Sequence, residues 1–128
     1  MKRFLLIIWQ LPQMIVSAII YMFIDVKDFK LIDNKAVIFS DRMRGGLCLG
    51  ELIIISTRIG ACKLEKTLRH ELGHSRQSEI LGWFYLLVIG LPSLLHAVYH
   101  AIFCYGDQEG YYKFYTERWA DELGGVER

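Results

Sequence analysis

The chain carries little net charge and few cysteines, and both shortages exclude classes of protein. Lys and Arg number 15 against 14 Asp and Glu among 128 residues, so no field of one sign indicates nucleic acid or an acidic partner. The three cysteines, Cys48, Cys62 and Cys104, form no CxxC pair, which indicates free thiols or small apolar fillers. Repeats and low-complexity segments are absent as well, and the length allows one domain, residues 1–128.

Charged residues are missing altogether from two long stretches, residues 4–24 and 81–105. Both exceed the roughly 18 apolar residues that usually signal a membrane span. So small a chain has too little other structure to cover two such helices all round, so we expect the lipid bilayer to be a partner. The first stretch follows Lys2 and Arg3 and continues past a passable signal-cleavage site, which favours a retained hydrophobic anchor.

Only two prolines are present, and each lies near the middle of a hydrophobic stretch: Pro12 in the first and Pro92 in the second. A proline removes a backbone hydrogen bond and kinks or ends a helix, so we expect both helical segments to be interrupted. A turn back at residues 90–93 would make residues 81–105 a shallow re-entrant hairpin with arms of about 16 Å.

The pentapeptide from His70 to His74 reads HELGH and has the HExxH pattern. On a helix, two histidines four residues apart share one face and both reach one zinc ion, while Glu71 can take a proton from a zinc-bound water. Gly73 is unfavourable inside a helix, which indicates that another segment approaches the backbone there. An apolar stripe at i, i+4 and i+8 should hold this helix in place: Leu64, Leu68 and Leu72.

A second motif near the C-terminus offers a third ligand. Glu117 and Asp121 are four residues apart in a segment that Gly124 and Gly125 should end as a helix. Catalytic zinc usually takes three protein ligands and keeps a fourth position for water. Glu117 is the candidate carboxylate ligand, and Asp121 can accept the free N–H of a ligating histidine. Taken alone, such a pair also fits an ordinary amphipathic helix.

HELGH followed by ERWAD resembles the gluzincin pattern of zinc peptidases, HExxH plus ExxxD. Within that group the chain resembles membrane-embedded proteases such as the CaaX prenyl protease and the bacterial heat-shock membrane protease, whose motifs flank a hydrophobic hairpin. It is also similar to a group of small bacterial proteins with GHSxQS and YYxFYTExWADxLGG stretches. The resemblance implies a zinc metalloendopeptidase of the bacterial inner membrane acting on a protein or peptide, with Zn²⁺ on His70, His74 and Glu117, Glu71 as base, and Asp121 supporting a ligand.

The region between the hydrophobic stretches predicts β-structure. Residues 36–40 and 51–56 are rich in β-branched side chains, and residues 47–49 can form a short strand between glycines. We expect a meander of two or three strands packed on the HExxH helix, hence an α+β fold. In peptidases of the resembled type an edge strand beside that helix binds the substrate backbone, so residues 47–56 are the candidate. A sheet that only buries the helix is an equal alternative.

Two other functions compete with a peptidase. His96, His100 and Cys104 fall at i, i+4 and i+8 and can line one helix face as an intramembrane metal or haem site, although no carboxylate base stands beside them. The chain can also be a non-catalytic membrane interaction or assembly protein whose HExxH is structural.

Sequence leaves the oxyanion donor and the orientation open. Tyr111, Tyr112 and Tyr115 are candidate hydrogen-bond donors to a tetrahedral oxyanion, and nothing chooses among them. Ten Lys and Arg between residues 25 and 80 favour a site on the cytoplasmic face.

Overall fold

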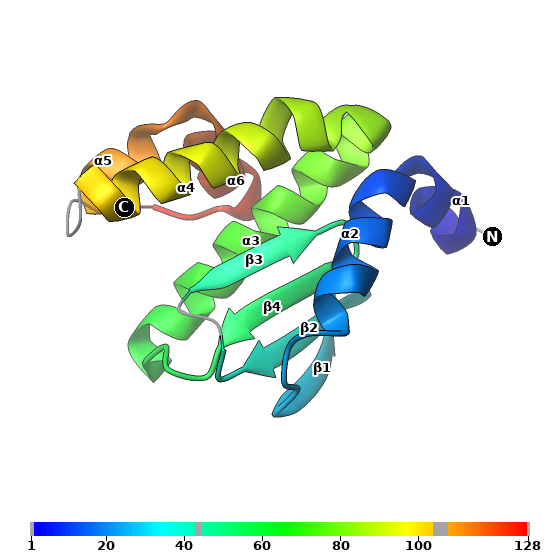
Figure 1. Ribbon diagram of the computed structural model, residues 1–128, viewed down its shortest axis with the longest axis horizontal. Coiled ribbons are helices and arrows are strands. Elements are labelled where there is room, and N and C mark those ends of the chain that lie inside the picture. The colour runs from blue at the N-terminus through cyan, green and yellow to red at the C-terminus, as the bar shows by residue number, and fades with distance from the viewer. Residues whose placement is uncertain (1, 43–44, 104–107, 128) are drawn as a thin grey trace.

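The computed structural model describes residues 2–42, 45–103 and 108–127 and has the α+β class expected from the sequence (Figure 1). The helices are α1 (Lys2–Trp9), α2 (Leu11–Tyr21), α3 (Ala61–Leu81), α4 (Leu91–Phe103), α5 (Gln108–Lys113) and α6 (Tyr115–Gly124). A 3-10 turn, η1 (Gly82–Phe84), and a π-helical turn, η2 (Leu86–Gly90), precede α4. The strands are β1 (Asp28–Ile32), β2 (Lys35–Ser40), β3 (Gly46–Leu49) and β4 (Leu52–Ser56).

The sheet is mixed, so the predicted meander is wrong. Its strand order is β1-β2-β4-β3, with β2 parallel to β4 and the other neighbours antiparallel. Every residue of β4 is buried, because its run of Leu and Ile is apolar on both faces and fits only the interior of a sheet. β3 consequently lies beyond β4 as an edge strand. The candidate substrate strand, residues 47–56, is thus an edge in its first half and an interior strand in its second.

The first strand was not predicted from the sequence, because it is an exposed edge strand. β1 alternates charged and apolar residues and is joined to β2 by Asp33 and Asn34. These two residues have φ values of 51° and 63°, as a two-residue hairpin turn of the I′ type requires. The Asp-Asn pair was the available signal for this hairpin.

Helices cover both faces of the sheet (Figure 1). On one face, Val37, Ile53 and Ile55 pack against α3; each such buried side chain contributes about 1.5–3 kcal/mol. The partners from α3 are Leu64, Leu68 and Leu72, which confirms the predicted apolar stripe. On the other face, Ile38 and Ile54 pack against Ile20 and its neighbours from the N-terminal segment.

The first hydrophobic stretch is interrupted as predicted. α1 ends at Trp9, and α2 begins at Leu11 with Pro12 in its first turn, where a missing N–H costs no helical hydrogen bond. Each of these two helices is shorter than a membrane span needs. Within the described ranges, one helical run, Leu86–Phe103, has the length and apolar composition of a span.

The second hydrophobic stretch does not turn back at residues 90–93, so the predicted re-entrant hairpin is wrong. η2 and α4 form one helical run through Pro92. Pro92 has no N–H to donate to the carbonyl of Val88, four residues earlier, and a widened π-helical turn lies there in place of a break. The Tyr115 hydroxyl donates to that carbonyl at 2.6 Å. A side chain from α6 therefore completes the hydrogen bonding that the proline removes.

The chain reverses at Gly82 instead, between α3 and the 82–103 segment. Gly82 has a φ of +54°, and a Cβ there would lie 2.2 Å from the Trp9 ring, so conformation and space both require glycine. After α4 the chain returns, and α6 lies against α3. The HExxH and ExxxD motifs therefore meet without any turn inside the hydrophobic helix.

α3 and α6 touch backbone to backbone. A Cβ on Gly73 would lie 1.8 Å from the Ala120 carbonyl oxygen, and one on Gly124 would lie 2.0 Å from that of Arg69. Two glycines, one from each helix, thus allow an approach that any side chain would block. The predicted close approach at Gly73 is confirmed, and the helix carrying Glu117 ends at Gly125 in the left-handed conformation, as expected.

Replacing Gly73 should loosen this contact. Gly73→Ala puts a methyl group into rigid backbone, so we expect the free energy of unfolding to fall by about 2 kcal/mol or more in chemical denaturation. Gly60→Ala is the matched control, because nothing lies within 4 Å of the added carbon at the start of α3. The control should stay within about 0.5 kcal/mol of wild type. Equal stability of all three proteins would contradict the helix contact.

Candidate metal centre

Three buried side chains from α3 and α6 converge on one point. His70 and His74 lie one turn apart on α3, and Glu117 reaches them from the first turn of α6. Glu117 Oε2 lies 2.9 Å from the Nε2 atoms of both histidines. The ligand atoms of the three lie within 4.8 Å of one another. These residues form a possible metal-binding triad.

The outer nitrogen of each imidazole is held by an acceptor. His70 Nδ1 lies 2.7 Å from Asp121 Oδ1, a carboxylate oxygen that only accepts. His74 Nδ1 lies 2.7 Å from Gln77 Oε1, and the amide nitrogen of Gln77 donates to the Thr116 carbonyl at 2.9 Å. That second bond fixes the amide so that its oxygen faces His74. Both histidines therefore carry a proton on Nδ1, as metal-ligating histidines do.

This arrangement leaves acceptors facing one another across the site. With a proton on each Nδ1, the Nε2 atoms of neutral His70 and His74 present lone pairs to the Glu117 carboxylate. Three such acceptors are satisfied either by extra protons on both rings or by a cation among them. The donor set, two imidazoles and one carboxylate, is that of a catalytic zinc site. At ordinary zinc bond lengths a tetrahedral site spaces ligand atoms by about 3.3 Å, so the 2.9 Å contacts need only widen slightly.

The other oxygen of Glu117 is held by the hydrophobic helix. Ser93 Oγ, on α4, donates to Glu117 Oε1, which leaves Oε2 for the histidines. Neither Ser93 nor Gln77 was singled out from the sequence as a site residue. Gln77 lies one turn after His74 in the helix, and that spacing was the available signal. For Ser93 no sequence signal exists, because α4 and α6 meet only in the folded chain.

Glu71 lies beside the triad but is not part of it. It is 4% exposed, and a Cβ on Gly46 would lie 2.5 Å from its Oε1 atom. The carboxylate is therefore wedged between α3 and the edge strand β3. Burial raises the pKa of Glu71, and the neighbouring histidines counteract this only in part.

The residues of the triad shift one another's pKa values. Burial lowers the pKa of His70 and of His74, but hydrogen bonding to Glu117 outweighs it, so both lie above the usual value and that of His74 is about 9. Burial likewise raises the pKa of Glu117, and the hydrogen bonds from the two imidazoles reverse the effect and hold it well below the usual value.

The three candidate tyrosines have different surroundings. The Tyr115 hydroxyl donates to the Val88 carbonyl in the π-helical turn and not to a residue of the triad. The Tyr112 ring lies edge-on to His70, with centroids 5.3 Å apart. Burial and the charge of Glu117 raise the pKa of Tyr111. Tyr111 and Tyr112 are therefore the two candidate tyrosines that interact with residues of the triad.

The histidines of α4 are engaged in packing. His96 Nε2 lies 3.0 Å from the Tyr111 carbonyl oxygen, and its ring stacks on Phe114 with centroids 4.2 Å apart. The His100 ring lies 5.5 Å from that of His96. Cys104, the third member of the alternative stripe, lies outside the described residues. Among the residues that are described, the group able to hold a metal is the His70, His74 and Glu117 triad.

Metal binding should displace protons from this site. A ligating imidazole must be neutral at Nε2, whereas His74, with a pKa of about 9, is protonated near neutral pH. Zinc affinity should therefore rise with pH, about tenfold per pH unit for each displaced proton, up to that pKa. Calorimetric zinc titrations in buffers of different ionisation enthalpy measure the protons released.

Single histidine variants distinguish metal binding at this site from metal binding at the histidines of α4. His70→Ala and His74→Ala should each lose tight zinc binding, and His96→Ala should keep it. A zinc affinity that does not change between pH 6 and 8, or one lost only in His96→Ala, would contradict the assignment.

The site as a whole combines a possible metal-binding triad, a buried carboxylate outside it and the edge of a sheet next to that carboxylate. Comparisons with protein-family models, with curated proteins and with solved structures find no match to this chain.

Proposed function

We propose that the protein is a membrane-associated zinc metalloendopeptidase. The observation that carries the proposal is the convergence of two Nδ1-protonated imidazoles and a carboxylate beside a second, buried carboxylate that binds none of them. A purely structural zinc site uses four protein ligands and needs no adjacent base. Three ligands with a carboxylate beside them suit hydrolysis, because a coordination position stays open for water or substrate.

Each residue has a distinct task in this proposal. His70, His74 and Glu117 would hold a zinc ion, which supplies a Lewis acid for the peptide carbonyl and lowers the pKa of a bound water. Glu71 takes the proton of the attacking water and passes it to the leaving amine. The raised pKa of Glu71 suits both halves of that transfer, since a base works best when its pKa approaches the working pH. Tyr111 or Tyr112 would donate a hydrogen bond to the developing oxyanion.

The edge strand offers a place for the substrate backbone. Ser56 N–H donates to the Gly45 carbonyl at 2.9 Å, so alternate residues of β3 pair with β4, and Gly46 and Cys48 direct their backbone groups outward. The Cys48 carbonyl accepts from the Tyr85 hydroxyl at 3.4 Å. Gly46 is left beside Glu71, and an extended peptide pairing there would bring its scissile bond to the triad.

Membrane association is the second half of the proposal. It is supported by the helical run Leu86–Phe103, which is long and apolar enough for a membrane and of which 6% is buried. We place the protein at the inner membrane of a bacterium, with the site on the cytoplasmic face, where the Lys and Arg of residues 25–80 are favoured.

Glu71→Gln separates catalysis from metal binding. The amide is close to isosteric with the carboxylate but takes up no proton, so cleavage of an unfolded protein such as casein should fall at least about a hundredfold while zinc content stays at wild-type level. Glu65→Gln is the control, because Glu65 is exposed on the same helix. A Glu71→Gln protein with full activity would sink the mechanism. A wild-type protein that binds zinc and cleaves nothing would favour a non-catalytic role.

Gly46→Ala tests the position of the base. The added methyl meets the Glu71 carboxylate, so Glu71 must move, and misplacement of about 1 Å costs on the order of a hundredfold in rate. Gly45→Ala is the neighbouring control, since nothing lies within 4 Å of a Cβ there. We expect the maximal rate to fall in Gly46→Ala alone, with zinc retained in both. Equal rates in both variants would show that β3 does not position Glu71.

A further inference from the structure

The two hydrophobic segments bury their polar side chains and expose their apolar ones, the reverse of helices in a water-soluble protein. In the first segment the polar residues Gln10, Gln13 and Ser17 are buried, at 0%, 0% and 3% exposure. Large apolar residues of the same segment are exposed: Phe4, Leu5, Ile7, Ile8, Trp9, Leu11, Ile15 and Ile19. In water the apolar stripe of a surface helix faces the core. The reversed pattern indicates an apolar environment outside.

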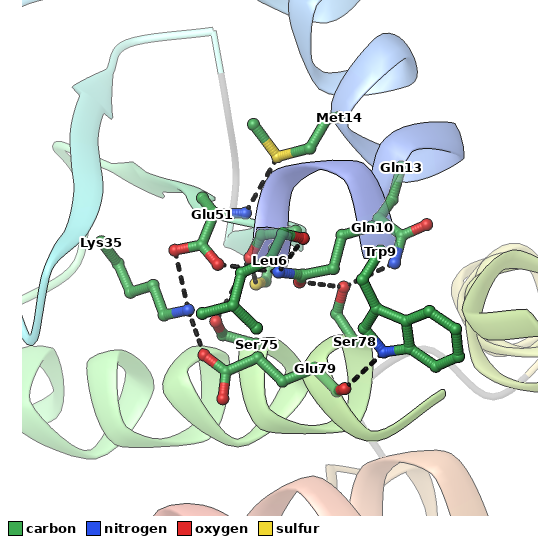
Figure 2. A network of polar contacts seen from close by, with 12 residues as sticks. Leu6, Trp9, Gln10, Gln13, Met14, Lys35, Glu51, Ser75, Ser78 and Glu79 are labelled. Carbon is green, nitrogen blue, oxygen red and sulfur yellow. Dashed lines mark hydrogen bonds and ion pairs between the residues drawn. The ribbon is translucent and has the colours of Figure 1, made fainter. Parts of the chain in front are cut away.

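A polar network holds the buried side of this segment (Figure 2). Gln10 donates to Glu51 at 2.8 Å and accepts from Ser78 Oγ at 2.5 Å. Gln13 donates to Ser78 Oγ at 2.7 Å and to the Gly82 carbonyl at 2.9 Å. Lys35 joins the network through ion pairs with Glu51 and Glu79. α1 and α2 are thus fastened to α3 by their polar residues, which leaves the apolar residues facing away.

The second segment repeats this pattern. Ser93 and His96 of α4 face the protein, where they bind Glu117 and the Tyr111 carbonyl. The opposite face carries exposed apolar residues along its whole length: Leu87, Leu91, Leu94, Leu95, Val98, Ile102 and Phe103. This helix is therefore not a core helix of the chain, although it passes the length and composition test for a span.

Two tryptophans join the apolar faces of the two segments. Trp83 Nε1 donates to the Ile8 carbonyl at 2.8 Å, and Trp9 Nε1 donates to the Glu79 carbonyl at 2.8 Å. Both indole N–H groups are thus satisfied inside the protein, while the residues remain half exposed, Trp83 at 55% and Trp9 at 45%. These bonds link the exposed apolar residues of α1, the 82–88 turn and α4, which we call the apolar belt.

The neighbours of α4 exclude a crossing of the bilayer. α6 and α5 contact α4 on its inner side, and they carry exposed charges at Lys113, Arg118 and Glu122. A crossing α4 would take these charges and the open edge of the sheet into hydrocarbon, which has no partner for them. An α4 that lies flat needs only its outer face in lipid.

We propose that the apolar belt is an in-plane membrane interface: α1, the 82–88 turn and α4 lie parallel to the bilayer surface in one leaflet, and no segment of the described chain crosses it. This rests on the membrane association in the proposed function and is independent of its chemistry. The metal centre then lies directly under the membrane surface, because Ser93 on the inner side of α4 binds Glu117.

Depth measurements along α4 test the orientation. Spin labels on single cysteines at Leu87, Leu95 and Ile102, in the full-length protein with its own cysteines replaced, sample about 22 Å of one helix face. The protein is reconstituted in vesicles of phosphatidylcholine and phosphatidylglycerol. Relaxation by oxygen against a water-soluble nickel complex gives each depth, with Glu65 as the aqueous control site. Circular dichroism verifies the fold of each variant.

The in-plane interface predicts equal depth at the three positions, within a few ångströms, and an exposed Glu65 label. A deepest label at Leu95, with shallow labels at both ends, would show that α4 crosses and would overturn the in-plane orientation while leaving membrane association intact. Labels that the nickel complex reaches in the presence of vesicles would overturn the lipid interface itself. So would labels that a second copy of the chain protects from the nickel complex when no vesicles are present. None of these outcomes depends on hydrolysis.

Native tryptophans give a check without labels. Brominated lipids should quench Trp9 and Trp83, each measured as the single tryptophan of the chain, at least about threefold more strongly than Trp119, which packs in the cluster with Leu49 and Tyr85. Equal quenching of all three would contradict the belt.

Discussion

The backbone contact between α3 and α6 is the constraint on which the rest of the structure depends. Gly73 and Gly124 let the helices approach so closely that a carbonyl of each occupies the space of a side chain on the other. At that separation Glu117 and Asp121 reach both nitrogens of His70. A wider spacing would leave buried carboxylates and imidazoles without partners, which is costly in a low-dielectric interior. The same contact therefore sets helix packing and the geometry of the possible metal-binding triad.

Buried polar side chains lie on two sides of α3, one facing the triad and the other facing the N-terminal helices. His70 and His74 belong to the possible metal-binding triad on one side of this helix, and Ser75 and Ser78 bind the Gly50 carbonyl and Gln10 on another. Each of these four side chains has a specific hydrogen-bond partner, whereas the buried Gln13 Oε1 and Thr116 Oγ1 atoms have none among the described residues. Hydrogen bonds at their polar positions consequently hold the apolar helices, and the large apolar side chains of these helices remain exposed.

Local pattern was enough to predict several elements. The spacing of Leu64, Leu68 and Leu72 identified the buried face of α3, and Gly73 marked its contact with another segment, because helical periodicity and glycine cost are properties of neighbouring residues. The ExxxD helix and its glycine end, and the interruption near Pro12, follow from the same kind of signal. The two histidines of HExxH share a face of any helix that contains them, because they are four residues apart.

Tertiary structure alone decided the features that join distant residues. The sequence determined that Pro92 lacks an N–H, but only the fold supplies the Tyr115 hydroxyl that lets the helix continue past it. The parallel pairing of β2 with β4 joins strands that are not neighbours in the sequence, and strand propensity does not express which strands pair. Likewise Ser93 meets Glu117 only across two helices. Side-chain type and helical periodicity are written locally, whereas a hydrogen bond between separate elements exists only once the chain has packed.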